Sequence, residues 1–269
     1  MSSYVVTGAS RGLGYEWITY LAKKDPSNTV IAIVRNKAAT EARLEKDGHF
    51  KNIHVLSADI TDLPALQKAA KETSAITGGT LDVLIHNAAV LDQRTGYINP
   101  VEDKIELLAK DLKDFFDGNV VGTAYVLDSF LPLIRAGTTK KVAVISTGMA
   151  DLDIVAKFDL DMATPYSVSK AAANLLVGKY HAALGRSEGV LLFNLSPGFV
   201  DTREGKPFTE EDMQGMQKMG AKFAAYAPDF KGMISVQESV EAQMQVIDKA
   251  TVETYGGAFV SHHGDKNWL

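Results

Sequence analysis

The chain has 269 residues and a net charge of -5, and 46% of its residues are apolar while 23% are charged. This balance is typical of a soluble globular protein with a large core, and it gives no basic footprint for nucleic acid or an anionic membrane. The absence of cysteine excludes disulfides and thiolate metal sites.

The first residues lack the basic segment and the long apolar segment of a secretory signal. No stretch of the sequence approaches the roughly 20 apolar residues that a membrane span needs. We therefore expect a cytoplasmic protein with neither a membrane nor a nucleic acid as its partner.

Short apolar runs alternate with longer amphipathic segments along the whole chain. The runs are nearly continuous in apolar residues, which indicates strands buried on both faces. They cover residues 4–6, 29–34, 53–56, 81–85, 142–145, 190–193 and 257–260, and helix-length segments cover 14–24, 62–77, 111–135, 164–186 and 237–250. This alternation predicts an α/β fold, a doubly wound (Rossmann) parallel seven-stranded sheet with helices on both faces.

No linker or repeat interrupts this pattern, so we expect a single domain over residues 1–269. Residues 203–233 differ from the rest because they mix methionine and aromatic residues with glycine, proline and charged residues. They follow the sixth strand, at the sheet edge where ligands bind in this architecture, and we expect a substrate lid there. Met213, Met216 and Met219 are spaced by three, which leaves core packing and ligand contact both open.

A glycine-rich segment, 7–14, follows the first strand and opens a helix. Its glycines permit a tight turn, and the free N–H groups at the helix N-terminus favour an anion such as a pyrophosphate. Arg35 ends the second strand, where an acidic residue would favour NAD and an arginine favours the 2′-phosphate of NADP(H). Arg11 is a second cation at the same corner, so we expect NADP(H) as the cofactor.

Tyr166 and Lys170 lie four residues apart at the start of an expected helix, and therefore on one face of it. A free tyrosine has a pKa of about 10 and is a poor acid at neutral pH. A nearby ammonium group lowers such a pKa. We therefore expect Lys170 to make Tyr166 a general acid for reduction, or a base for oxidation.

These motifs resemble the short-chain dehydrogenase/reductase family over nearly the whole chain. Residues 7–14 resemble its Thr-Gly-x-x-x-Gly-x-Gly loop, and residues 87–89 resemble its Asn-Asn-Ala-Gly motif, from which His86 and Ala89 depart. The ending 256–260, with Gly264 and Trp268, looks like the branch of C-factor and sniffer-type carbonyl reductases. We interpret His86 as a structural residue.

The resemblance implies a set of cofactor contacts. Asp59 matches the position that holds the adenine ring, and Pro197 to Thr202 match the segment that holds the nicotinamide carboxamide. The cofactor-binding residues it implies are Gly8, Ser10, Arg11, Gly12, Leu13, Gly14, Arg35, Asp59, Ile60, Asn87, Ala88, Ala89, Tyr166, Lys170, Pro197, Gly198, Val200 and Thr202.

The resemblance also implies a catalytic hydroxyl at the end of the fifth strand and an asparagine that supports the lysine through a water molecule. Asn119 fits the asparagine. Alignment with the family selects Thr147 as the hydroxyl, with Ser146 as the alternative, since successive strand residues point to opposite faces. The 19-residue gap from Thr147 to Tyr166 exceeds the dozen or so usual in the family. We expect its extra part, 151–163, to be a solvated loop, or alternatively a pocket wall, without a metal.

The hypothesis is hydride transfer between NADP(H) and a ketone or aldehyde, with Tyr166 as general acid/base and an apolar substrate. Two alternatives stay open: a non-redox enzyme of the same fold, such as an isomerase, dehydratase or cyclase, and a catalytically silent NADP(H) sensor. The resemblance also implies a homodimer or homotetramer, with the helices around 111–135 and 164–186 at the interface.

Overall fold

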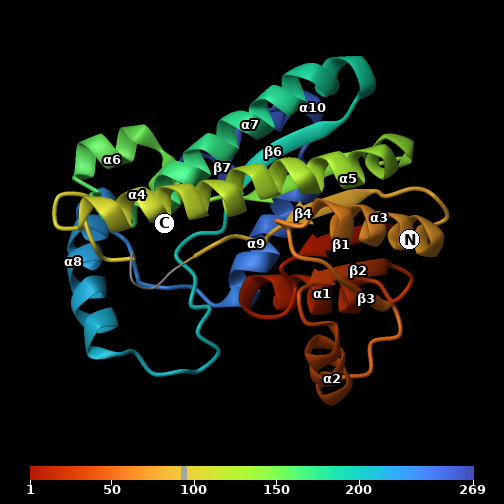
Figure 1. The fold of residues 1–269 in the computed structure, drawn as a ribbon, viewed down its shortest axis with the longest axis horizontal. Helices are drawn as coiled ribbons and strands as arrows, with labels where there is room; N and C mark the ends of the chain where they lie inside the picture. Colours follow the sequence, from red (N-terminus) through yellow and green to blue (C-terminus); the bar gives the residue numbers. More distant parts are fainter. Residues whose placement is uncertain (92–95) are drawn as a thin grey trace.

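The computed structural model describes residues 1–91 and 96–269. In these residues one parallel sheet of seven strands has the order β3-β2-β1-β4-β5-β6-β7 (Figure 1). The strands are β1 Ser3–Thr7, β2 Thr29–Val34, β3 Ile53–Ser57, β4 Val83–His86, β5 Lys141–Ile145, β6 Leu191–Ser196 and β7 Phe259–Ser261. Every neighbouring pair is parallel. The predicted fold class is therefore confirmed, with strand ends that differ from the sequence pattern by at most three residues.

Helices cover both faces of the sheet (Figure 1). They are α1 Gly12–Lys24, α2 Lys37–Asp47, α3 Leu63–Thr77, α4 Ile105–Phe116, α5 Gly122–Ala136, α6 Leu152–Phe158, α7 Thr164–Glu188, α8 Glu210–Tyr226, α9 Val236–Lys249 and α10 Val252–Tyr255. Alternate side chains of each strand enter two separate cores. Val6 packs with α1 and α9 around the fully buried Trp17, whereas Val5 packs with α3, α5 and α7 around Phe130. Two-sided burial explains why the strands are apolar at successive positions.

The expected helix over 111–135 is wrong as a single element. The structure begins α4 at Ile105 and separates it from α5 by one π-helical turn, Asp117–Val121. Such turns insert an extra residue into the helical ladder, and their wider ring of hydrogen bonds is seldom visible as a change in hydrophobic periodicity. The turn contains Asn119, one of the expected site residues.

The expectation of a solvated loop over 151–163 is also wrong. The segment contains α6, and Ile154, Leu160 and Met162 are buried in a third apolar cluster. Lys222 of α8 forms an ion pair with Asp161. The extra residues between Thr147 and Tyr166 therefore support the segment that follows the sixth strand.

The expected lid over 203–233 contains α8, which begins with a reciprocal cap between Thr209 and Asp212. α8 sends Met219 and Phe223 into the third apolar cluster, while Met213 is 53% exposed. The methionines spaced by three therefore have different surroundings: Met219 packs in the third apolar cluster, whereas Met213 faces away from it. In Figure 1 the lid extends to the side of the sheet, beside α6.

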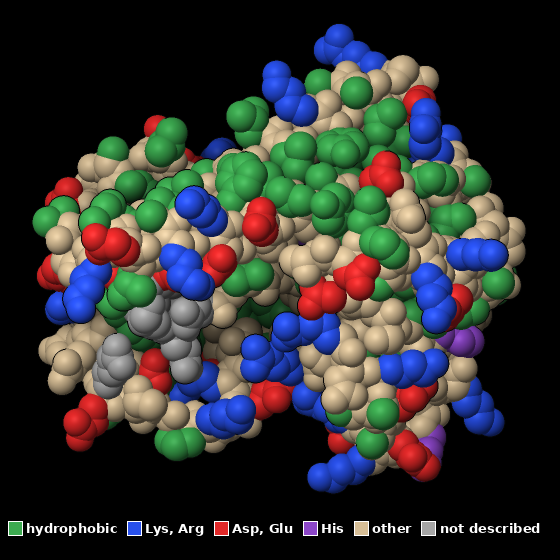
Figure 2. All heavy atoms as spheres, in the orientation of Figure 1, with side chains coloured by type: hydrophobic (Ala, Val, Ile, Leu, Met, Phe, Trp, Pro, Cys, Tyr) green, Lys and Arg blue, Asp and Glu red, His purple; other side chains and the backbone are tan. Residues whose placement is uncertain are grey.

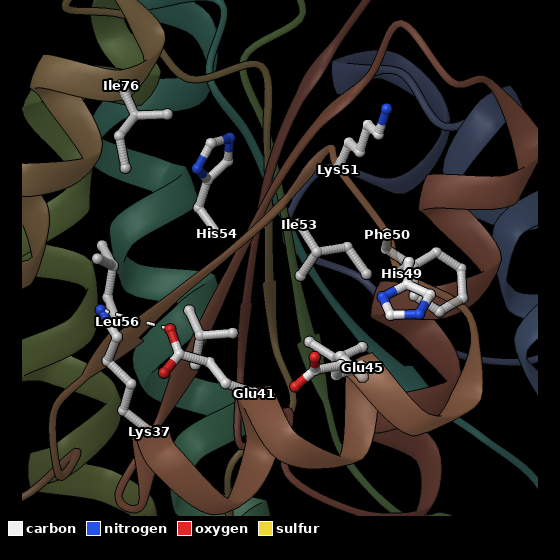
Figure 3. A pocket seen from close by; sticks show the side chains of 12 residues that line it. Lys37, Glu41, Glu45, His49, Phe50, Lys51, Ile53, His54, Leu56 and Ile76 are labelled. Atoms are coloured by element: carbon white, nitrogen blue, oxygen red, sulfur yellow. Dashed lines mark ion pairs between the residues drawn. The ribbon is translucent and has the colours of Figure 1, made fainter.

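A hollow of about 590 Å³ lies at the β3 edge of the sheet, between α2 and the strand (Figure 3). Glu41 and Glu45 of α2 line it together with Ile53 and His54 of β3. Its lining contains none of the residues expected to bind a cofactor or substrate, and it is an open groove along an edge strand. Within the described ranges, no helix is long and apolar enough to cross a membrane.

Candidate active site

The glycine-rich loop joins β1 to α1 with almost no room for side chains. Gly8 has a φ of +67°, and a Cβ atom there would lie 2.8 Å from the Cα of Ala88. A Cβ at Gly14 would lie 2.2 Å from the carbonyl oxygen of Gly8. A Cβ at Gly12 would lie 3.3 Å from Thr202. The loop is thus a tight backbone cradle at the N-terminus of a helix, the geometry that binds phosphate groups.

Asn87 and Ala88 fix this cradle to the next strand of the sheet. The Asn87 side chain donates to the carbonyl oxygens of Thr7 and Gly8, at 3.2 and 3.3 Å. The Ala88 N–H donates to the Thr7 hydroxyl at 3.1 Å. The structure therefore brings two of the expected residues, Asn87 and Ala88, against the glycine-rich loop.

Two further expected cofactor residues meet at the carboxyl ends of β2 and β3. Arg35 approaches Asp59, with 4.0 Å between Nη1 and Oδ2, and its side chain is 81% exposed. Asp59 accepts hydrogen bonds from the backbone N–H and the hydroxyl of Thr61, which fix its carboxylate. Arg11 is exposed at the N-cap of α1. Cations thus flank the glycine-rich loop on its outer side.

The segment after β6 lies on the other side of the loop. Gly198 has a φ of +84°, and a Cβ there would lie 2.8 Å from the His262 ring. Val200 forms a short parallel bridge with Ile234 at the far end of the lid. The segment then carries Thr202 to the glycine-rich loop, so its two ends lie near the sheet edge and near that loop.

Tyr166 and Lys170 lie in the first two turns of α7, which begins after a left-handed residue, Ala163, and has Pro165 in its first turn. Lys170 is only 2% exposed, and burial lowers its pKa to about 8. Burial raises the pKa of Tyr166 to about 12. The expected lowering of the Tyr166 pKa by Lys170 is therefore wrong for the protein alone, because the loss of hydration on burial raises this pKa. Tyr166 is a protonated phenol at neutral pH.

Asn119 connects the π-helical turn to α7. Its side chain accepts from the N–H of Val90 at 2.6 Å, and donates to the Val90 carbonyl at 3.1 Å and to the Ser169 hydroxyl at 2.9 Å. The Ser169 hydroxyl donates in turn to the Tyr166 carbonyl at 2.8 Å. Asn119, Ser169 and Tyr166 are thus parts of one hydrogen-bonded unit, and Lys170 is buried one turn further along α7.

His86 lies behind this unit and is fully enclosed, with 1% of its surface exposed. Its Nδ1 lies 2.7 Å from the Thr7 hydroxyl, and its Nε2 lies 3.0 Å from the Thr123 hydroxyl. The Thr123 hydroxyl donates to the carbonyl oxygen of Asn119 at 2.6 Å. Burial, and secondarily the Lys170 charge, lower the pKa of His86 to about 3, so this ring is neutral. A continuous buried chain therefore links β1 to the π-helical turn.

The two hydroxyls at the end of β5 have different surroundings. Ser146 is 2% exposed, and its hydroxyl donates to Asn174 Oδ1 on α7 at 2.7 Å. Thr147 is half-buried, and its hydroxyl accepts from the Met149 N–H at 3.3 Å. Ser146 is thus committed to packing β5 against α7, while Thr147 keeps a hydroxyl proton to donate.

Two residues at the glycine-rich loop were not expected from the sequence. Arg43 of α2 and Glu204 of the lid form an ion pair, with 2.8 Å between Nη1 and Oε1. They are 161 positions apart, so no local spacing signals the pair. Arg43 follows Arg35 by eight residues on an exposed helix, a pattern that is usually only a solvated face.

The chain is identified by its sequence as a short-chain dehydrogenase/reductase: the short chain dehydrogenase family model matches residues 3–213, and the chain belongs to this oxidoreductase family. The short-chain dehydrogenase/reductase AacuF of Aspergillus aculeatus is 48% identical over 269 residues, which cover 100% of both chains.

Solved structures of carbonyl reductases share the fold. The NADPH-bound carbonyl reductase from chicken fatty liver has a TM-score of 0.75 at 22% identity, and the alignment covers 98% of each chain. The carbonyl reductase Sniffer of D. melanogaster has a TM-score of 0.74 at 22% identity and the same coverage. The predicted resemblance to the sniffer-type branch is confirmed at the level of the fold.

The site suits the nicotinamide cofactors that this family uses. The cradle formed by Gly8, Gly12 and Gly14 would be filled by any Cβ, and a carboxylate already accepts from its Gly12 N–H. These are the features expected where backbone must approach an anionic ligand closely. In the described part of the chain, no group of three or more His, Asp or Glu side chains is arranged to hold a metal ion.

Proposed function

We propose that the protein is an NADP(H)-dependent carbonyl reductase that reduces a ketone or aldehyde to an alcohol. The observation that carries this proposal is the placement of a protonated Tyr166 one helical turn from the buried Lys170 on α7, with the Tyr166 backbone linked to Asn119 through Ser169. This unit lies at the carboxyl edge of the sheet, which also carries the glycine-rich cradle. The whole chain would act as one nucleotide-binding domain with the lid over 203–233.

NADPH, when bound, supplies the hydride that reduces the carbonyl carbon. Tyr166 donates its phenolic proton to the carbonyl oxygen, and the Thr147 hydroxyl holds that oxygen as its negative charge develops. Lys170 would place a positive charge near the same oxygen, and Asn119 would support the lysine through a water molecule. A phenol whose pKa is raised is in the correct form for reduction, because it starts each cycle protonated.

We propose an apolar substrate of medium size. Met149 and Phe199 are half-buried side chains that follow β5 and β6. Phe199 stacks edge-on with Phe223 of α8, at 5.3 Å between ring centroids. Movement of the lid would therefore expose aromatic surface after the carboxyl end of β6, where an apolar carbonyl compound could bind.

We also propose a homodimer or homotetramer. Ile105 and Phe116 of α4, with Val168 and Leu175 of α7, are each at least 46% exposed. The space-filling view shows apolar side chains gathered in a band over α4, α5 and α7 (Figure 2). Exposed apolar bands of this kind are typical of subunit interfaces.

Substitution of Tyr166 by phenylalanine tests the mechanism most directly. We expect Y166F to lower kcat/KM for carbonyl reduction by about 10²- to 10⁴-fold, the usual contribution of a general acid. The Kd for NADPH, measured by fluorescence titration, should change less than about twofold. Tyr180→Phe on the same helix is the matched control and should leave both quantities unchanged.

Three outcomes would contradict the proposal. A retained rate in Y166F would refute the proton donor. Wild-type protein that binds NADPH but consumes none across a panel of aldehydes and ketones would favour the silent sensor or the non-redox enzyme. Wild-type protein that binds neither NADPH nor NADH would refute the cofactor assignment itself.

A further inference from the structure

A carboxylate from the lid is bound at the glycine-rich loop. Oε1 of Glu204 accepts a hydrogen bond from the Gly12 N–H at 2.9 Å. The same oxygen lies 2.8 Å from Nη1 of Arg43. One oxygen atom thus connects the N-terminus of α1, the side of α2 and the segment after β6, three parts of the chain that are distant in sequence.

Arg43 is held in place before any ligand arrives. Its guanidinium carbon lies 3.6 Å from the centroid of the Tyr15 ring. Its Nε lies 3.6 Å from Oδ2 of Asp47, and this carboxylate also accepts from the Tyr15 hydroxyl at 2.9 Å. A further contact of 3.4 Å joins Nη1 to the carbonyl oxygen of Ser10. The side chain is therefore stacked on one face and fixed at one end, and its Nη1 is directed toward the glycine-rich loop.

This arrangement distinguishes Arg43 from Arg35, the cation that the sequence singles out. Arg35 is 81% exposed, whereas the Arg43 side chain is 34% exposed and stacked on an aromatic ring. A pre-ordered guanidinium loses less conformational entropy when it binds an anion, so Arg43 is the better placed of the two to bind a phosphate.

The carboxylate of Glu204 is chemically a substitute for a phosphate. Burial alone would raise the pKa of Glu204, but the Gly12 N–H and the Arg43 guanidinium outweigh it and lower the pKa. The group is therefore an anion at neutral pH. A helix N-terminal N–H and a guanidinium are the donors that proteins commonly use for phosphate oxygens. A second anion cannot share these donors with Glu204 without strong repulsion.

We propose that Arg43 is a specificity-determining residue for the 2′-phosphate of NADP(H), and that Glu204 occupies its guanidinium until the cofactor displaces it. This inference rests on the cofactor proposed above and assigns the selectivity to a residue outside the family motifs. Displacement frees the lid segment from the glycine-rich loop, so cofactor binding and lid position are coupled.

The test compares Kd values for NADPH and NADH, measured by fluorescence titration in a buffer free of phosphate and sulfate. We expect Arg43→Met to weaken NADPH binding about tenfold or more and to change NADH binding less than about twofold, the scale of one charge-assisted contact. Glu204→Gln should tighten NADPH binding about threefold, because the competing charge is removed. Arg43→Lys keeps the charge and should retain part of the preference for NADPH.

Arg135→Met is the matched control, since Arg135 forms an exposed ion pair with Glu188 on other helices, and it should alter neither Kd. Equal weakening of NADPH and NADH by Arg43→Met would overturn the inference, because it would indicate that Arg43 only supports Tyr15 and the loop. Unchanged binding of both would also overturn it. Wild-type protein that binds neither dinucleotide refutes the proposed function as well, and that result is visible before any variant is made.

Discussion

The proposed active site has two ends, the catalytic end around Tyr166 and Lys170 and the phosphate end around the glycine-rich loop, and they are held together by different kinds of interaction. At the catalytic end, His86, Asn119 and Lys170 are each at most 2% exposed, and the side chains of His86 and Asn119 form hydrogen bonds with neutral groups. At the phosphate end, Arg35, Arg43 and Glu204 are each at least one-third exposed and interact through ion pairs.

This difference determines how strongly each end should respond to change. Removing the hydrogen-bond partner of a buried polar group costs the most free energy, because water cannot replace that partner. Exposed ion pairs are weakened by solvent and by salt. We therefore expect substitutions at the catalytic end to have large effects that are insensitive to salt, and substitutions at the phosphate end to have smaller effects that decline as salt increases.

The largest effect expected within the catalytic end distinguishes the roles of the Thr147 and Ser146 hydroxyls. Thr147→Val removes the proposed hydroxyl donor and should lower kcat/KM by about 10²- to 10³-fold, as for other groups that stabilise an oxyanion. Thr147→Ser keeps the donor and should restore most of the activity. Ser146→Ala should change kcat/KM less than about fivefold, because its hydroxyl is bonded to Asn174.

Steady-state kinetics with one aldehyde and saturating NADPH would measure these variants, and the NADPH Kd would control for folding. A larger loss in Ser146→Ala than in Thr147→Val would contradict the assignment. It would mean that Ser146 leaves Asn174 when substrate binds.

The second prediction concerns pH. Burial lowers the pKa of Lys170 to about 8, so the lysine is cationic below pH 8 and loses its charge above it. If the cation is needed for proton donation, kcat/KM for reduction should fall about tenfold per pH unit above pH 8. Tyr166, with a pKa of about 12, does not titrate in this range. Lys170→Met should be slow at every pH with a flat profile, and Lys179→Met on the exposed face of α7 should retain the wild-type profile.

The decline with pH should be the same at low and high salt if it comes from a buried group. A profile of kcat/KM against pH whose midpoint moves with salt would indicate an exposed titrating group. It would contradict the expectation that only the phosphate end responds to salt. A wild-type profile that is flat to pH 10 would show that Lys170 does not titrate as its burial indicates.

The sequence predicted the parts of the molecule that depend on local pattern. Continuous apolar runs specify strands buried on two faces, and the glycines at 8, 12 and 14 specify a backbone cradle because a Cβ cannot fit there. The order of the strands and the carboxyl-edge position of the site then follow from the short connections and right-handed crossovers of such folds.

The sequence did not reveal features that arise from packing over long distances. The residues 151–163 resemble a solvated loop because of their four aspartates, yet Leu160 and Met162 are buried beneath α8. The ion pair of Arg43 with Glu204 requires the folded lid. The raised pKa of Tyr166 follows from burial, whereas the spacing of Tyr166 and Lys170 alone suggests a lowered pKa.

The smallest of the expected effects concerns stability. The pKa of His86 is lowered to about 3 in the folded protein, against about 6.5 when unfolded. The unfolded chain therefore binds a proton at His86 below pH 6.5 while the folded chain does not. This part of the stability is complete above pH 6.5 and is lost progressively as the pH falls toward 3, by about 2 kcal/mol at pH 5.

His86→Asn places at this position the residue found in the motif that the chain resembles, and it removes the titration. The free energy of unfolding is measured with urea at pH 7 and at pH 5. From pH 7 to pH 5 it should fall in both proteins, but by about 2 kcal/mol less in His86→Asn than in the wild type. His262, whose pKa burial lowers to about 4, adds acid sensitivity to both proteins and cancels in this difference. The exposed His49→Gln is the control and should decline as the wild type does. An equal decline in His86→Asn would show that the buried chain from Thr7 to Asn119 tolerates a charge, and the catalytic end would then be more hydrated than the packing around His86 indicates.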